Sequence, residues 1–120
     1  MELNPDCMRD VLGLIAKNPM GSFIDKIPNE LKEKYSDDDL IYTLKMIDEA
    51  KLAHINFYYG SNRLAAFSIS QMTPKGQELY SKIKPRTIWE KTKNAIKNIG
   101  APFTVNLIKE VATKELLASI

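Results

Sequence analysis

The sequence predicts an α+β fold: a winged helix-turn-helix domain of three helices and a β-hairpin wing, followed by an α-helical C-terminal extension. Residues 36–52 combine a capping serine with apolar residues at helical spacing. Residues 53–70 follow at once, with two alternating strands around a tight turn. Two shorter helical segments come before them, and this order of elements is that of a winged helix. Winged helices bind DNA, RNA or protein, so the fold alone does not assign a function.

The composition is that of one globular chain. Its 120 residues are 44% hydrophobic and 27% charged. We divide them into a winged-helix domain at residues 1–84 and a C-terminal helical extension at residues 85–120, which serves packing or dimerisation. The only cysteine, Cys7, cannot form an internal disulfide, and one histidine with one cysteine does not supply a metal site. We therefore expect no metal and no other cofactor.

The sequence also carries expectations about location. The N-terminal residues are charged and lack the apolar core of a signal peptide. No window approaches the about 18 uninterrupted apolar residues of a membrane-spanning helix. We therefore expect a cytoplasmic protein with no membrane span.

The first part of the chain has the signals of two short helices. Asn4-Pro5-Asp6 supplies an N-cap, a proline at the first helical position and an acidic residue in the first turn. Apolar residues then recur at helical spacing at Met8, Val11, Leu12 and Ile15. Residues 22–27 are predicted to form an edge strand beside the wing. Pro28 then begins a second helix of about two turns.

A capped third helix follows. Ser36 is its N-cap, and Asp39, three residues later, completes a variant of the capping box. Three aspartates in the first turn favour the positive end of the helix dipole. The apolar stripe of this helix, which we assign to the core, consists of Leu40, Leu44 and Ile47.

The hairpin and a fourth helix come next. Residues 60–62 supply the turn of the hairpin. The alternation of side chains is carried by Ile55, Phe57 and Tyr59 in the first strand and by Ala65, Phe67 and Ile69 in the second. Thr73-Pro74 begins the fourth helix, and Gly76 within it is expected to permit close approach of a neighbouring backbone.

The C-terminal extension contains two further helices. The first has an apolar face, with Trp89 and Ile96 at its flank, and residues 100–102 end it. Thr104 caps a last helix with two apolar stripes, and such a helix needs two packing partners. We expect one partner to be the chain's own domain and the other a second copy of the chain. The residues predicted at or near this homodimer contact are Trp89, Ile96, Ile108 and Val111. Trp89 alternatively anchors the extension to the domain.

Several motifs together resemble a bacterial family of unknown function. They are the opening Asn4-Pro5-Asp6-Cys7 with Arg9-Asp10, the segment ELKEKYSDDDLIYTLKMIDEA, the segment MTPKGQELYSKI and the closing Trp89-Glu90-Lys91-Thr92. In these residues the chain resembles domain-of-unknown-function family 2513 over nearly its whole length. That family is common in Gram-positive bacteria and their prophages, and it is similar in plan to the YjcQ-type winged-helix proteins. The resemblance implies a winged helix and a mobile-element context, but no biochemical activity.

Two positions depart from the pattern of such winged helices. Their third helix commonly contains His-Leu, where this chain has Thr43-Leu44, and commonly ends in Ala-Gly-Leu, where this chain has Ala50-Lys51-Leu52. Glycine takes the left-handed C-cap conformation at little cost. Lys51 must therefore accept that strain, or the helix must end differently. Neither change threatens the predicted fold.

Charge is distributed unevenly along the chain. Residues 1–52 hold seven Lys or Arg against eleven Asp or Glu, a net charge of −4, and residues 53–120 hold ten against four, a net charge of +6. On a helical wheel the third helix presents outward Asp38, Tyr42, Lys45 and Glu49. This line contains two acids and no Arg, Asn or Gln, which are the side chains that recognise guanine and adenine in the major groove. The pattern argues against base recognition by this helix.

Other residues remain as candidates for contact with DNA. The candidate set consists of Tyr42 and Lys45 in the third helix, Asn62 and Arg63 at the wing tip, and Lys82, Lys84, Arg86, Lys93 and Lys97 around the start of the extension. Two alternatives apply to the basic residues. They can be solvated, or they can meet an acidic protein surface such as the third helix of a second copy.

Two functional hypotheses follow. The first is a small phage-type or mobile-element DNA-binding regulator of transcription, favoured by the scaffold. The second is a protein–protein interaction adaptor on the same scaffold, because the exposed face of the third helix is acidic. No catalytic constellation occurs, since the lone His54 has no Ser or Cys partner in view, so we do not expect an enzyme. The expected partners are DNA, a protein or a second copy of the chain.

Overall fold

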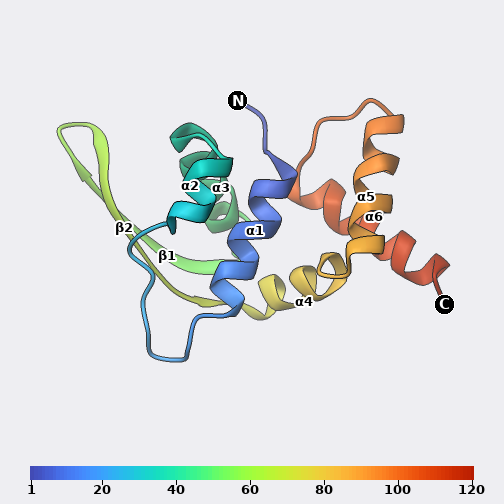
Figure 1. Cartoon of the computed structure of the whole chain (residues 1–120), viewed down its shortest axis with the longest axis horizontal. Coiled ribbons are helices and arrows are strands. Elements are labelled where there is room, and N and C mark those ends of the chain that lie inside the picture. The colour runs from blue at the N-terminus through green and yellow to red at the C-terminus, as the bar shows by residue number, and fades with distance from the viewer.

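The computed structural model describes all 120 residues and has an α+β fold of six helices and one two-stranded antiparallel sheet (Figure 1). The elements in chain order are α1 (Pro5–Ala16), α2 (Asn29–Lys34), α3 (Asp37–Glu49), β1 (Ala53–Gly60), β2 (Arg63–Met72), α4 (Pro74–Ile83), α5 (Arg86–Asn98) and α6 (Val105–Ala118). Helices α1 to α3 and the hairpin form the predicted winged helix. Helices α4 to α6 continue on the side away from the wing (Figure 1). The predicted fold class is confirmed.

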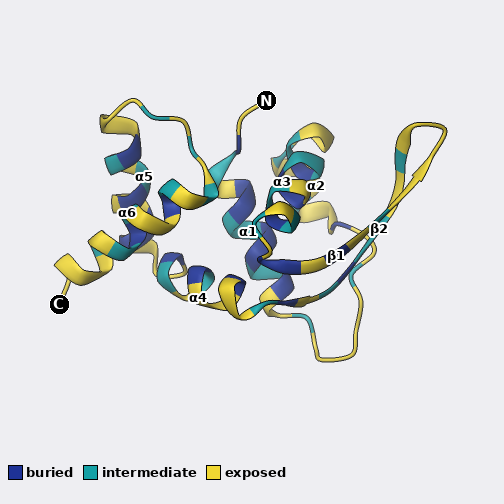
Figure 2. Ribbon diagram, turned by 180° about the vertical axis from the view of Figure 1, so that it is seen from behind, coloured by how far each residue is buried: buried dark blue, intermediate teal, exposed yellow.

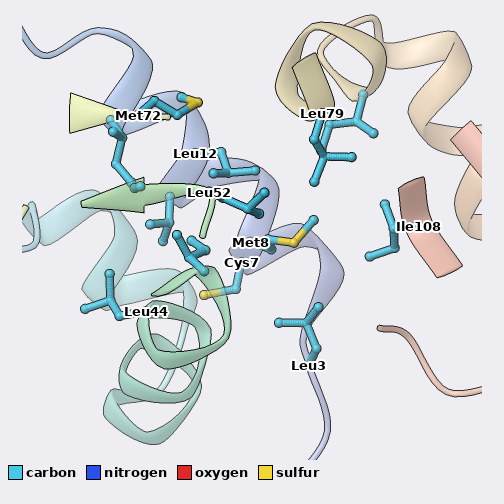
Figure 3. Close-up of a cluster of buried hydrophobic side chains, with 14 of the residues drawn as sticks. Leu3, Cys7, Met8, Leu12, Leu44, Leu52, Met72, Leu79 and Ile108 are labelled. Carbon is cyan, nitrogen blue, oxygen red and sulfur yellow. The ribbon is translucent and has the colours of Figure 1, made fainter. Parts of the chain in front are cut away.

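Helix α1 lies at the centre of the core. The Asn4 side chain accepts a hydrogen bond from the Cys7 N–H at 3.2 Å, and a proline occupies the first turn, as predicted. The buried face of α1 consists of Cys7, Met8, Val11, Leu12 and Ile15. Figure 3 shows Met8 lying between Leu44 of α3 on one side and Ile108 of α6 on the other. One helix therefore supplies core residues to both the winged helix and the extension.

The other predicted N-caps are present. Ser36 before α3, Thr73 before α4 and Thr104 before α6 each accept a hydrogen bond from the backbone N–H three residues later, at 3.1 Å. Each of these bonds satisfies one of the N–H groups that the first turn of a helix leaves without a partner. The starts of these three helices are therefore determined locally.

Residues 22–27 do not form the predicted edge strand. Within them only Ile24 pairs with Ile69 of β2, through two backbone hydrogen bonds of 2.8 Å. Ile27 then turns into the core, and Pro28 lacks the N–H that a further pair would need. The prediction was right about the place of this pairing and wrong about its length.

Helix α3 ends in a Schellman motif with a lysine at the left-handed position. The Leu52 N–H donates to the Ile47 carbonyl at 3.0 Å, and the Lys51 N–H donates to the Asp48 carbonyl at 2.9 Å. Lys51 has a φ of 59°. It therefore accepts the left-handed conformation, which costs a residue with a Cβ about 1 kcal/mol.

The wing is a long hairpin whose outer half is exposed (Figure 2). Near the core, Ile55 of β1 pairs with Ile69 of β2, and both are buried. At the tip, Ser61 and Asn62 have φ values of 52° and 66°, as in a two-residue turn that matches the twist of the two strands. Tyr59, near this tip, is 59% exposed. The wing therefore offers aromatic surface that the chain itself does not cover.

Gly76 of α4 permits the close approach that the sequence predicts. A side chain at this position would overlap the carbonyl oxygen of Leu52, at the junction of α3 and β1. The same carbonyl accepts a hydrogen bond from the Thr73 N–H at 2.9 Å. The first turn of α4 is therefore in backbone contact with Leu52, between α3 and β1.

The extension shares one core with the winged helix. A single cluster of 21 buried residues contains side chains from α1, α3, both strands, α4, α5 and α6. Ile96 of α5 and Ile108 of α6 belong to it and have no exposed area. The boundary between residues 84 and 85 therefore divides the sequence, but the hydrophobic core includes residues from both sides of it.

Replacing Lys51 with glycine is expected to stabilise the protein by about 0.5–1 kcal/mol, because glycine adopts the left-handed conformation without a Cβ clash. Urea unfolding followed by circular dichroism measures the change. Lys51→Ala is the matched control: it removes the same charge and keeps the Cβ, so it should stay within about 0.5 kcal/mol of the parent. Equal stabilisation by both variants would show that the backbone conformation is not the cause.

Candidate functional site

Trp89 anchors the extension to the first turn of α1. Its indole is 2% exposed, and Nε1 donates a hydrogen bond to Asp6 Oδ1 at 2.9 Å. Lys93 Nζ donates to the same oxygen at 2.9 Å. The Arg9 guanidinium and the Lys93 ammonium lie 5.9 Å and 5.5 Å from the indole centroid, within the range of cation–π contact. The sequence-based alternative of a packing anchor describes Trp89 correctly.

The charges of this anchor reinforce one another. Burial alone would raise the pKa of Asp6, but the hydrogen bonds from Lys93 and Trp89 outweigh it and lower that pKa from 3.8. Burial alone would lower the pKa of Lys93, but the hydrogen bond to Asp6 outweighs it and raises that pKa above 10.5. Asp6 is therefore a carboxylate and Lys93 an ammonium at neutral pH.

Arg9 joins a third helix to the anchor. Its Nε donates to the Ile83 carbonyl at 2.9 Å and its Nη2 donates to the Lys84 carbonyl at 2.6 Å. These carbonyls end α4, where a cation also complements the negative end of the helix dipole. Helices α1, α4 and α5 are therefore held together by side chains from two turns of α1.

The predicted dimer residues lie inside the chain. Trp89, Ile96 and Ile108 are buried in the core, and Val111 is half-buried and packed against it. The three buried residues are therefore covered by the chain itself, and the predicted homodimer contact stays a prediction. Helix α6 packs on α5 and α4 of the same chain, with Ile108 and Ala112 buried and Leu107 and Val111 packed against the core. The apolar side chains that the extension leaves exposed are Ile99, Leu116, Leu117 and Ile120.

A groove of about 530 Å³ lies between the C-terminal half of α3, the first part of α4 and the start of α6. Half of its 16 lining residues are hydrophobic: Leu3, Tyr42, Met46, Ala50, Leu52, Leu79, Phe103 and Val105. Leu3, Leu52 and Leu79 are buried and form its floor, whereas the others are half-buried. Figure 3 shows Leu3 and Leu79 on the same side of Met8 as Ile108, away from Leu44. Phe103 and Val105, which follow α5 in the chain, therefore form one wall of the groove, and Tyr42 and Met46 of α3 form the other.

The groove has an excess of positive charge. Its charged residues are Glu49, Lys51, Lys75, Glu78, Lys82 and Lys109. Lys82 Nζ is occupied, since it lies 3.4 Å from Glu78 Oε1 and donates to Thr113 Oγ1 at 3.1 Å. The ammonium groups of Lys51, Lys75 and Lys109 have no carboxylate within 4.0 Å. Three free cations and one free anion therefore border an apolar floor.

The nine candidate DNA-binding residues do not gather in one place. Tyr42 lines the groove, whereas Lys45 lies on the wing side, 5.8 Å from the Tyr59 ring centroid. Asn62 and Arg63 are exposed at the wing tip, away from the extension (Figure 1). Lys82 and Lys93 are engaged within the chain, in the groove and in the Trp89 anchor. The candidates that stay exposed around α5 are Lys84, Arg86 and Lys97.

The exposed side of α3 is acidic. Its exposed residues are Asp37, Asp38, Lys45 and Glu49. Asp37 and Asp38 belong to the first turn, the part of a recognition helix that contacts base edges in the major groove. Carboxylates in that position face a dense row of phosphates and do not offer hydrogen bonds to guanine. The structure keeps the acidic line that the helical wheel predicts.

Other chemical features of the chain are structural. Cys7 is buried, and burial raises the pKa of its thiol. Burial and the hydrogen bond to Asp10, 2.6 Å long, raise the pKa of Tyr35, which ties α2 to α1. No three His, Cys, Asp or Glu side chains gather as a metal site requires. None of the helices has the length and apolar character needed to cross a membrane.

Sequence reasoning missed the groove. Lys75, Phe103 and Lys109 were assigned no role, because each lies on a different element and no local pattern relates them. One available signal was the break at residues 100–102, which allows the chain to turn back toward α3. The other is the pair of apolar stripes on α6, of which one is predicted to face the chain's own domain and one a second copy.

The order of elements, the wing and the packed C-terminal helices define a winged-helix protein with a helical extension. The model of the family described as Hypothetical protein (DUF2513) matches residues 2–102, and the chain belongs to that family. No curated protein and no solved structure matches the chain. The matched region contains both Asp6 and Trp89, so the anchor lies within the family region, and α6 lies beyond it. The predicted family is confirmed.

Replacing Asp6 with asparagine is expected to destabilise the protein by about 1 kcal/mol at neutral pH. The amide oxygen can still accept from Trp89, but Lys93, whose side chain is 13% exposed, loses its main counter-charge. Because the folded-state pKa of Asp6 is lowered, its contribution is complete above 3.8 and is lost as the pH falls through the folded-state value. The difference between parent and variant should therefore shrink in acid.

Urea unfolding at several pH values measures this dependence. Glu90→Gln is the control, because it removes the more distant carboxylate partner of Lys93, at 3.4 Å, with the same change of charge. It should cost no more than a few tenths of a kcal/mol. An Asp6→Asn deficit that stays constant in acid would mean that packing, rather than charge, is responsible.

Proposed function

We propose that this protein is a protein–protein interaction adaptor built on a winged-helix scaffold. The observation that carries the proposal is the groove beside α3. The extension closes one side of the helix that a DNA-binding winged helix leaves open, with Phe103 and Val105 opposite Tyr42 and Met46. What remains exposed on α3 is mainly acidic. An apolar floor with a polar, charged rim is the composition of a protein-binding surface.

The arrangement of the basic residues also supports this proposal. A DNA-binding surface needs its cations on one face, where they can follow the phosphates of one duplex. Here Lys45 and Arg63 lie on the wing side, whereas Arg86 and Lys97 lie on α5, on the other side of α1 (Figure 1). Two further candidates, Lys82 and Lys93, make hydrogen bonds within the chain.

A DNA-binding regulator of the phage type is the second candidate function, and the wing favours it. The segment from Ala53 to Met72 contains no acidic residue. Arg63 and Asn62 are exposed at its tip, and Lys45 adds a cation beside Tyr59. In this function the wing rather than α3 contacts the duplex, through phosphates or the minor groove.

Fluorescence anisotropy with a random labelled duplex, measured at several salt concentrations, separates the two functions. The adaptor is expected to show no saturable binding at low salt. A wing-binding regulator is expected to bind, with a slope of log affinity against log salt of about −0.9 for each phosphate neutralised.

Arg63→Gln is the diagnostic variant. In a wing-binding regulator it should reduce the salt slope by about 1. Lys114→Gln, an exposed residue near the end of α6, is the matched control and should leave the slope unchanged. DNA binding that Arg63→Gln weakens and Lys114→Gln does not would overturn the adaptor proposal.

A further inference from the structure

The floor and walls of the groove are suited to apolar side chains from a partner. Leu52 and Leu79 close the floor, and Met46 and Phe103 stand half-buried at the sides. Methionine and phenylalanine side chains adapt to apolar partners of different shape. A volume of about 530 Å³ accommodates a few side chains, not a whole domain.

The rim specifies the charge of the partner. Lys51 lies at the end of α3, Lys75 in the first turn of α4 and Lys109 on α6, so cations border the groove on all three elements. All three are exposed and free of carboxylate partners, whereas Glu49 is the one free anion. Lys75 and Lys109 belong to residues 53–120, which carry a net charge of +6, and Lys51 is the last cation of residues 1–52, which carry a net charge of −4.

We propose that the groove binds an acidic amphipathic segment of a partner protein. Its apolar side chains insert between Met46 and Phe103, and its Asp or Glu side chains meet Lys51, Lys75 and Lys109. This inference rests on the proposed function and names the chemistry of the partner. The three lysines are spread around the groove, so they can pair with a segment that carries several carboxylates along its length. A small anion would instead need several hydrogen-bond donors directed at one point.

The experiment uses the full-length protein labelled with ¹⁵N and two synthetic peptides of about 15 residues. Both carry leucine and phenylalanine at the same helical positions i, i+3 and i+7. One has glutamate at the remaining exposed positions, and the other has lysine there. We expect the glutamate peptide to bind at least about tenfold more tightly than the lysine peptide and to shift the amide signals of Met46, Lys75 and Phe103. Its affinity should fall as salt is added.

A pair of variants on the same helix tests the rim. Lys109 lines the groove, and Lys109→Glu should reduce the affinity for the glutamate peptide about three- to tenfold. Lys114→Glu makes the same change of charge five positions along α6, outside the groove, and should leave the affinity unchanged. Both positions are exposed, so neither variant is expected to unfold the protein.

Several outcomes would overturn the inference. Equal binding of the two peptides would do so, as would signal shifts outside the groove. Displacement of the glutamate peptide by inorganic phosphate at ordinary buffer concentrations would show a site for a small anion instead. A dimer in light scattering, with groove signals that move as the free protein is diluted, would show that a second copy occupies the groove. Failure of the proposed function is distinct: there the duplex DNA binds and neither peptide does. If the lysine peptide alone binds the groove, the adaptor proposal stands and the acidic partner is excluded.

Discussion

The contact between Trp89 and Asp6 decides where the C-terminal extension lies. The indole N–H and the Lys93 ammonium donate to the same carboxylate oxygen, and Arg9, from the next turn of α1, holds the last carbonyls of α4. With α5 fixed in this way, the chain after it returns to α3, and Phe103 reaches the groove. Helix α6 packs on α5 and α4, which the anchor joins to α1, and Ile108 of α6 is buried there.

Helix α3 therefore has three different surfaces. Its apolar stripe packs on α1, its exposed line is acidic, and Tyr42 and Met46 turn toward the extension. In a winged helix that recognises DNA, the outward surface must be free and rich in hydrogen-bond donors. Here the extension occupies one side of that surface and aspartates occupy another. The scaffold of a DNA-binding domain is thus combined with a surface whose composition suits a protein partner.

The parts of the fold that depend on short stretches of sequence could be predicted well. The N-caps at Ser36, Thr73 and Thr104, the turn before Arg63 and the close approach at Gly76 all follow from residue types that act within a few positions. The candidate site could not be predicted in the same way. The long-range partners of Lys82 and Lys93, Thr113 and Asp6, lie 31 and 87 positions away along the chain, and no local pattern indicates them.

By itself, the sequence determined the six helices, the hairpin and their order, the acidic line on α3 and membership of the family, because periodicity, capping and motifs are local properties of the chain. Only the tertiary structure decided which apolar stripe faces which partner. Two stripes on α6 require two neighbours, but the sequence does not say whether those neighbours belong to the same chain. In the structure α6 packs on α5 and α4 of the same chain, and the hydrogen bond from Trp89 to Asp6 joins α5 to α1, beside the groove.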